Sequence, residues 1–156
     1  MTSKFFVTVV AAIAMLQQQS VAQWQLRKAQ FNNENALALQ GYDPVAYFTQ
    51  GKAVKGSSAY SVNVDGLIYQ CSTAVNKQLL EKDPKKYEPQ YGGWCAYAMG
   101  NMGEKVDVNP ETFKIVDDKL YLFYNAYFNN TLIDWNKNET SLKQKADVNW
   151  KKFFNP

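Results

Sequence analysis

Residues 59–71, AYSVNVDGLIYQC, are the stretch that says most about the fold of this 156-residue chain. Apolar and polar residues alternate before Asp65-Gly66, and a second strand-like run follows that pair. Asp-Gly between two such runs is typical of a two-residue type I′ turn, because both turn residues need a positive φ angle. The stretch therefore predicts a β-hairpin.

A second hairpin is predicted where FKIV (113–116) and LYLFY (120–124) flank Asp117-Asp118-Lys119. Short helices are expected around the two hairpins, one of them opened by Asp43-Pro44 and another capped by Ser72. Further helices are expected at Trp94 to Met99, Thr131 to Trp135 and Thr140 to Trp150. The pattern indicates an α+β fold, with a small antiparallel sheet built from two hairpins and several short helices packed on it.

The amino-terminal residues predict export from the cytoplasm. Lys4 precedes a 12-residue apolar run from Phe5 to Leu16, and a polar stretch leads to small residues at Ser20-Val21-Ala22. This is the pattern of a secretory signal peptide, and the run is short for a membrane span. We expect residues 1–22 to be removed, and the protein to be secreted or periplasmic with no membrane span after cleavage.

The remaining chain has the length of one domain. We divide it into an amino-terminal arm (23–40), a globular domain (41–152) and a carboxy-terminal tail (153–156). Its net charge is small, since the whole chain has 17 basic and 14 acidic residues. Basic residues are interspersed with acidic ones, so we expect no nucleic-acid partner.

The chain contains no histidine. Catalytic triads and dyads that use histidine, and metal sites that use imidazole ligands, are therefore excluded. Any general base would have to be a carboxylate, a lysine, a tyrosine or the chain amine. This composition favours a binding module over an enzyme.

From Gly41 to about Trp150 the chain resembles the secreted branch of the YHS-domain family. The resemblance is carried by GYDPVAYF (41–48), DPKKYEPQYGGWCAYAMG (83–100), FKIVDDKLYLFYN (113–125) and KADVNW (145–150). It implies a small module grouped with cysteine-bearing domains thought to bind heavy metals. In the metal-binding relatives a C-x-x-x-C pair follows the first hairpin, and its positions match Ser72 and Asn76 here. The family's histidine has no counterpart either, so metal binding does not transfer directly.

Two cysteines, Cys71 and Cys95, leave three alternatives open. In an oxidising compartment they would form a disulfide, worth about 3.5 kcal/mol for a loop of about 25 residues. With Met99 and Met102 they would form a soft-metal site suited to a copper ion, Cu(I). They would otherwise be two buried, inert thiols.

An aromatic cluster surrounds Gly92-Gly93, and it too has two interpretations. Tyr87, Tyr91, Trp94 and Tyr97 would line a pocket for a flat ligand or belong to the core. The two glycines would present N–H groups to an anion or simply permit a positive φ. We therefore predict an exported, YHS-like binding module with a soft metal ion such as copper as the candidate ligand. The alternative is a disulfide-stapled structural or protein-interaction domain without a small ligand.

Overall fold

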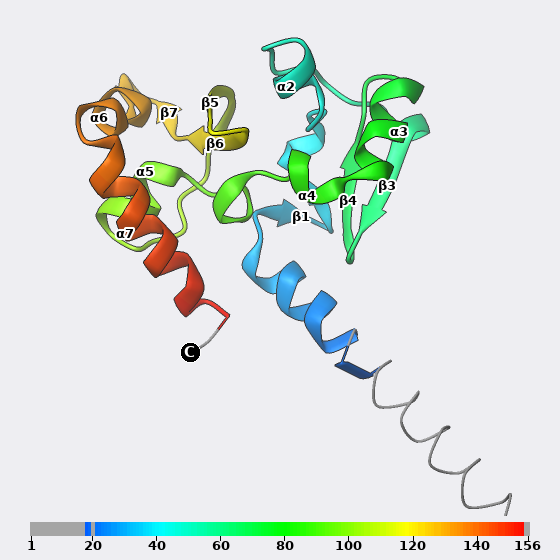
Figure 1. The fold of residues 1–156 in the computed structure, drawn as a ribbon, viewed down its shortest axis with the longest axis horizontal. Coiled ribbons are helices and arrows are strands. Elements are labelled where there is room, and N and C mark those ends of the chain that lie inside the picture. Colours follow the sequence, from blue (N-terminus) through cyan, green and yellow to red (C-terminus); the bar gives the residue numbers. More distant parts are fainter. Residues whose placement is uncertain (1–17, 20, 155–156) are drawn as a thin grey trace, which may run out of the picture.

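The computed structural model describes residues 18–19 and 21–154 (Figure 1). The predicted signal peptide lies almost entirely outside the described residues. A helix over residues 21–30, which we call the arm helix, leads into the body of the molecule. Within the described part, no helix has the length and apolar character that a bilayer crossing requires.

The first predicted hairpin is confirmed. Strand β3 (Ser61–Val64) pairs antiparallel with β4 (Leu67–Gln70), and Asp65 and Gly66 form the turn with φ of 47° and 87°. Two short strands, β1 (Asn33–Glu34) and β2 (Leu37–Ala38), extend this sheet in the order β1-β2-β4-β3. Part of the predicted arm (23–40) therefore belongs to the sheet.

The second predicted hairpin forms a separate sheet. Strand β5 (Asn109–Val116) pairs antiparallel with β6 (Lys119–Phe123), and the turn is the two-residue pair Asp117-Asp118. A third hairpin was not predicted: β7 (Asn125–Ala126) pairs with β8 (Asn129–Asn130) across Tyr127-Phe128. The α+β fold with small sheets is thus confirmed, although the two predicted hairpins lie in different sheets.

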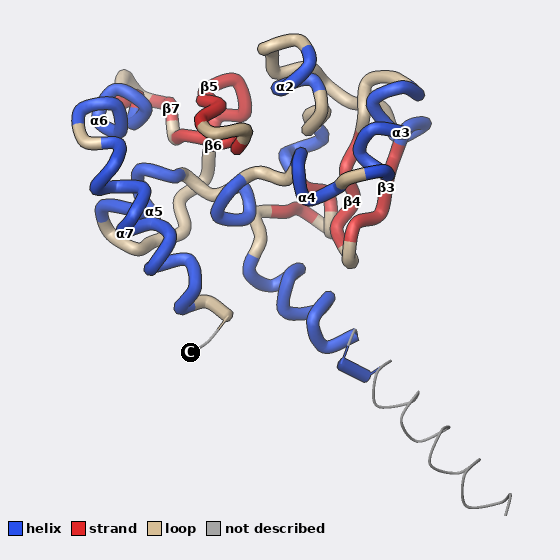
Figure 2. The backbone as a smooth tube through the Cα atoms, viewed as in Figure 1, coloured by secondary structure: helices blue, strands red, loops and turns tan. Residues whose placement is uncertain are grey.

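Short helices surround these sheets, as Figure 2 shows in blue. Their bounds are α2 Ala46–Thr49, α3 Ala74–Lys82, α4 Pro84–Tyr87, α5 Ala96–Asn101, α6 Thr131–Lys137 and α7 Glu139–Lys152. Short 3-10 helices occur at Leu39–Gly41, Ser58–Tyr60 and Gln90–Gly93. The predicted cap of α3 was wrong: the Thr73 hydroxyl, not Ser72, accepts the N–H of Asn76.

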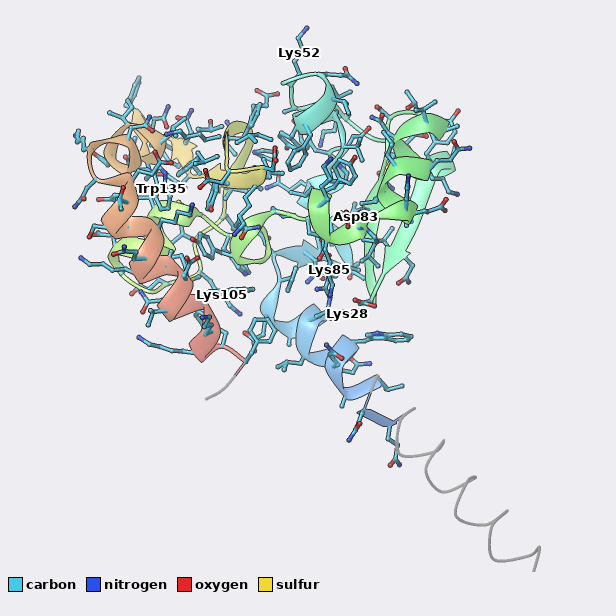
Figure 3. All side chains as sticks on the ribbon, viewed as in Figure 1. Lys28, Lys52, Asp83, Lys85, Lys105 and Trp135 are labelled. Carbon is cyan, nitrogen blue, oxygen red and sulfur yellow. The ribbon has the colours of Figure 1, made fainter. Side chains whose placement is uncertain are left out.

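Two buried clusters form the core, and strand β6 joins them. The first core lies around the β1-β2-β4-β3 sheet and includes Leu67 and Tyr69, while the second lies between α5, α6 and α7 around Trp135 (Figure 3). Because successive side chains of a strand point to opposite faces, β6 serves both. It sends Leu120 and Leu122 into the first core and Tyr121 and Phe123 into the second. This strand makes the two halves one domain.

Candidate functional site

The four predicted sulfur ligands have different surroundings. Cys71 follows β4 and is fully buried in the first core. Burial raises the pKa of its thiol to about 12, and the nearby charge of Asp43 adds to the effect. A thiol with this pKa is protonated at neutral pH, whereas metal ligation needs the thiolate.

The other three sulfurs lie in and around α5. The Cys95 sulfur contacts the Thr131 hydroxyl at 3.4 Å and accepts the backbone N–H of Tyr124 at 3.3 Å. Met99 is fully buried in the second core, whereas Met102, just beyond the last residue of α5, is 54% exposed. Met99 and Met102 therefore face different surroundings.

Cys71 and Cys95 are free thiols, so the disulfide is not formed in this structure. Among the residues that the structure describes, no group of three or more Cys, Asp or Glu side chains is placed to hold a metal ion. The soft-metal site stays a prediction, and its residues are spread between the first core (Cys71), the second core (Met99) and the surface (Met102).

A buried carboxylate stands where the sequence placed only a helix cap. Asp43 accepts hydrogen bonds from the backbone N–H groups of Val45 and Ala46 at 2.9 and 3.3 Å, although α2 begins at Ala46 with Val45 as its N-cap, two residues later than predicted. Its other oxygen accepts the Ser72 N–H, the Ser72 hydroxyl and the Asn76 amide at 2.6 to 2.7 Å. Asp43 is fully buried. We call this network the Asp43 centre, and it fastens α2 to the start of α3.

The most promising pocket lies beside the Tyr91-Gly92 loop, and we call it the Tyr91 pocket. Its volume is about 380 Å³. It is bounded by segments far apart in the sequence, including the arm, α4, β6 and α7. Its lining residues are Phe31, Lys85, Glu88, Pro89, Gln90, Tyr91, Gly92, Lys119, Asp147, Trp150 and Lys151.

The backbone of this loop is held in an unusual conformation. Tyr91 and Gly92 both have left-handed φ values, 54° and 61°. A Cβ atom on Gly92 would lie 2.8 Å from Trp150 and 2.9 Å from Phe31, whose rings meet edge to face. Left-handed residues with side chains are rare and concentrate at functional sites. Glycine at position 92 is therefore required by both the φ angle and the close ring contact.

Both carboxylates of the pocket already have internal partners. Glu88 forms a partly buried ion pair with Arg27 of the arm helix and accepts the Tyr69 hydroxyl at 3.0 Å. Asp147 accepts the Tyr91 hydroxyl at 2.9 Å. Burial, and next the charge of Asp147, raise the pKa of Tyr91, so its hydroxyl stays a proton donor.

The three lysines of the pocket, by contrast, have no internal partners. Lys85, Lys119 and Lys151 form no ion pair and donate no side-chain hydrogen bond to any described residue. Elsewhere on the surface, Lys114 and Lys143 are each paired with a carboxylate at 2.7 Å. Arg27 neutralises Glu88, and Asp147 offsets one of the three lysines, so the pocket keeps a net positive charge.

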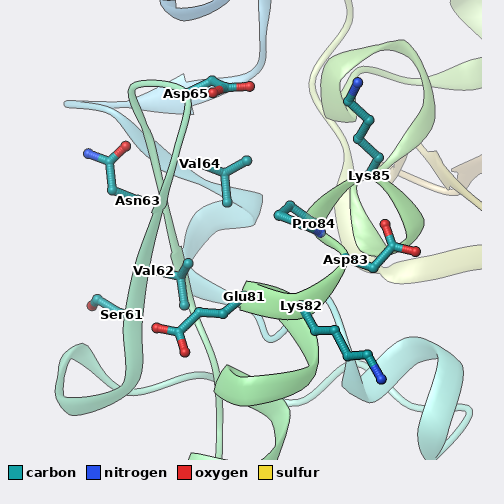
Figure 4. A pocket seen from close by; sticks show the side chains of 10 residues that line it. All are labelled: Ser61, Val62, Asn63, Val64, Asp65, Glu81, Lys82, Asp83, Pro84 and Lys85. Carbon is teal, nitrogen blue, oxygen red and sulfur yellow. The ribbon is translucent and has the colours of Figure 1, made fainter.

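A second hollow of about 510 Å³ lies beside the edge strand β3. In Figure 4, Val62 and Val64 face Pro84 across it, while the side chain of Lys82 points away. Its charged residues are of both signs, and no buried polar group lines it. Lys85 borders both hollows, but of these two the Tyr91 pocket is the one with aromatic walls.

The sequence pointed to the Tyr91-Gly92 loop but not to most of the other residues that line the pocket. Tyr87 and Tyr91 belong to the two cores, whereas Trp94 is partly exposed and its indole N–H donates to the Gln30 carbonyl at 2.7 Å. The lysines gave no signal because they are isolated in the sequence or sit in pairs that are typical of a solvated surface. Comparisons with models of protein families, with curated proteins and with solved structures found nothing that matches this chain.

Proposed function

We propose that this chain is an exported, YHS-like binding module, rather than an enzyme, and that it binds a small flat anion in the Tyr91 pocket. The observation that carries the proposal is the charge imbalance there. Three lysines lack internal partners, while Glu88 and Asp147 are already engaged. A ligand with a carboxylate or phosphate group would supply the missing negative charge.

The walls of the pocket support a flat apolar part in the ligand. The rings of Phe31 and Trp150 meet edge to face with centroids 5.7 Å apart, and they hold the loop that carries Tyr91. Ligand sites in proteins are mostly apolar, with a few polar groups that fix orientation. Here the Gln90 amide and the lysines would fix the anion.

The sulfur residues are a weaker candidate for the binding site than the Tyr91 pocket. The raised pKa of Cys71 disfavours the thiolate that a copper ion would need. Met99 is enclosed in the second core while Met102 is at the surface. The resemblance to YHS domains supports a binding module, and the ligand we assign differs from the metal ion that this resemblance suggests.

The proposal is tested by titrating the purified protein with benzoate, acetate and benzyl alcohol at about 0.15 M salt, following heat or Trp fluorescence. Benzoate should bind more tightly than acetate, which lacks the ring, and than benzyl alcohol, which lacks the charge. An exposed ion pair is worth about 0.2 to 1 kcal/mol. Lys119→Gln with Lys151→Gln should therefore weaken benzoate binding by roughly 2- to 30-fold.

A matched control removes the same charge elsewhere. Lys28 lies on the arm helix and Lys52 projects from the loop after α2, and neither lines the Tyr91 pocket (Figure 3). Lys28→Gln with Lys52→Gln should leave benzoate affinity within about twofold, because distant exposed charges are screened by salt. An equal loss in this control, or no preference of the wild type for benzoate, would contradict the proposal.

A further inference from the structure

The hairpin between β7 and β8 ends in two aromatic side chains that no residue among 18–19 and 21–154 covers. Tyr127 is 91% exposed and Phe128 is fully exposed. Neither ring takes part in a ring-ring contact with a described residue, and the Tyr127 hydroxyl has no hydrogen-bond partner among them. We call this pair the aromatic tip.

The backbone makes the choice of residues more unusual. Tyr127 and Phe128 are the two central residues of the turn, with φ of 51° and 63°. Turns of this shape favour Asn-Gly or Asp-Gly, since other side chains are strained at positive φ. The equivalent turn between β5 and β6 uses Asp117-Asp118, with φ of 50° and 55°. The aromatic tip therefore has a strained backbone and an exposed apolar surface, and no contact with another described residue offsets these costs.

The surroundings of the tip indicate what kind of surface it meets. Residues 125–130 carry no charge, and the tip is flanked by Asn125, Asn129 and Asn130. Asp134 and Lys137 of the following helix neutralise each other at 2.6 Å. Aromatic residues inside an uncharged rim are characteristic of protein interfaces, whereas binding to an anionic membrane needs Lys or Arg.

The chain itself carries a matching groove between α5 and α7. The groove has a volume of about 430 Å³, and Met102 and Val148, 54% and 58% exposed, lie in its wall. Its remaining lining residues are Gly100, Asn101, Gln144, Lys145 and Asn149. It contains no carboxylate and one lysine, and a thioether next to an aromatic ring is a favourable contact. We call it the Met102 groove.

We propose that two copies of this chain form a two-fold dimer in which the aromatic tip of each copy enters the Met102 groove of the other. A two-fold interface repeats each contact, so both tips are buried at once. Four aromatic side chains at about 150 to 250 Å² each remove roughly 600 to 1,000 Å². With a similar area from the two grooves, the interface reaches about 1,200 to 2,000 Å², the size of a stable one.

Sedimentation velocity over a range of protein concentrations tests the dimer. The wild type should sediment as a concentration-dependent dimer. Tyr127→Asn with Phe128→Gly supplies the residues that this turn favours, so it should fold with an unchanged or higher melting temperature and raise the dimer Kd at least a hundredfold. Val148→Lys changes an exposed groove residue and should have the same effect on Kd.

Mixing the two variants provides the decisive experiment. Each is expected to be monomeric alone, but together they retain one intact tip and one intact groove, so a mixed dimer weaker than the wild-type dimer should appear. A wild type that is monomeric at 1 mM, a dimer that survives in either variant, or a mixture that stays monomeric would overturn the proposal. Open-ended chains of wild-type protein would overturn the two-fold arrangement.

Discussion

The Asp43 centre and the Tyr91 pocket are two polar regions of the molecule whose carboxylates have different surroundings. Asp43 is fully buried and accepts five hydrogen bonds from α2 and the start of α3. Asp147 is exposed and accepts one, from Tyr91, beside lysines that have no partner. A polar group whose partners are all internal stabilises the fold, whereas cations without partners are available to a ligand. The following variants test this difference.

The largest effect is expected at the Asp43 centre. Asp43→Ala leaves the Ser72 N–H, the Ser72 hydroxyl and the Asn76 amide without their acceptor inside the protein. Each buried unsatisfied group costs about 1 to 3 kcal/mol, so the loss of three partners should lower the free energy of unfolding by at least about 3 kcal/mol in urea titrations. Ser72→Ala, which removes one donor, the hydroxyl, and keeps the acceptor, should cost only about 1 kcal/mol. If the two variants lost the same free energy of unfolding, Asp43 would not be the residue that holds the network together.

A somewhat smaller loss is expected where the arm helix is attached. Arg27→Gln removes the cation beside Glu88, and the two side chains are only 14% and 12% exposed. Breaking such a pair leaves a buried carboxylate with the Tyr69 hydroxyl alone, at a cost of about 3 kcal/mol. Hydrogen exchange should also become faster over residues 21–30. A loss below about 0.5 kcal/mol would mean that the arm is only loosely held.

The Tyr91 loop offers a matched pair of glycines. Gly92 and Gly51 have nearly the same φ, 61° and 62°, but an added Cβ meets Trp150 and Phe31 only at Gly92 and finds nothing within 4 Å at Gly51. Gly51→Ala should cost about 1 kcal/mol from backbone strain. Gly92→Ala should cost about 1 to 3 kcal/mol more, and it should weaken benzoate binding. Equal costs in urea titrations would show that the rings yield easily.

The smallest effect concerns alkaline pH. The pKa of Cys71 is raised from 9.0 to about 12 in the folded state, chiefly by burial. The stability that this shift contributes is complete below pH 9 and is lost as the pH rises toward 12, because only the unfolded chain ionises there. The loss should reach about 1 kcal/mol at pH 10. Burial also raises the pKa of Tyr69 and Tyr91, which adds to the decline.

Unfolding measured at pH 8 and pH 10 checks this effect, with Cys71→Ala as the control. The variant lacks the thiol, so its free energy of unfolding should fall less between the two pH values than that of the wild type. A parallel decline in both proteins would assign the effect to the tyrosines alone.

Local sequence signals predicted the elements well where turn chemistry was plain. Asp65-Gly66 marked the first hairpin and Asp117-Asp118 the second. The Tyr127-Phe128 hairpin could not be found in this way, because its residues are the opposite of those that its φ angles favour. The cap of α3 shifted by one residue because the Ser72 hydroxyl is used by Asp43, a tertiary contact that no local pattern reports.

The site was harder to predict than the fold for the same reason. The sequence grouped Cys95, Met99 and Met102 as ligands of one metal ion, but α5 ends at Asn101 and leaves Met102 beyond it. The Tyr91 pocket is assembled from four distant segments, so only the loop itself was visible in the sequence. Its distinguishing property, three lysines gathered beside aromatic rings, exists only once the chain is folded.

The contrast between the two polar regions is tested most directly by a benzoate titration of isotope-labelled protein followed by amide NMR. The account predicts progressive shifts at Gln90, Tyr91 and Gly92 and at the Trp150 indole, while the amides of Ser72 and Asn76 stay unchanged. Shifts at Ser72 and Asn76 with none at the Tyr91 loop, or no shifts at either place, would contradict it.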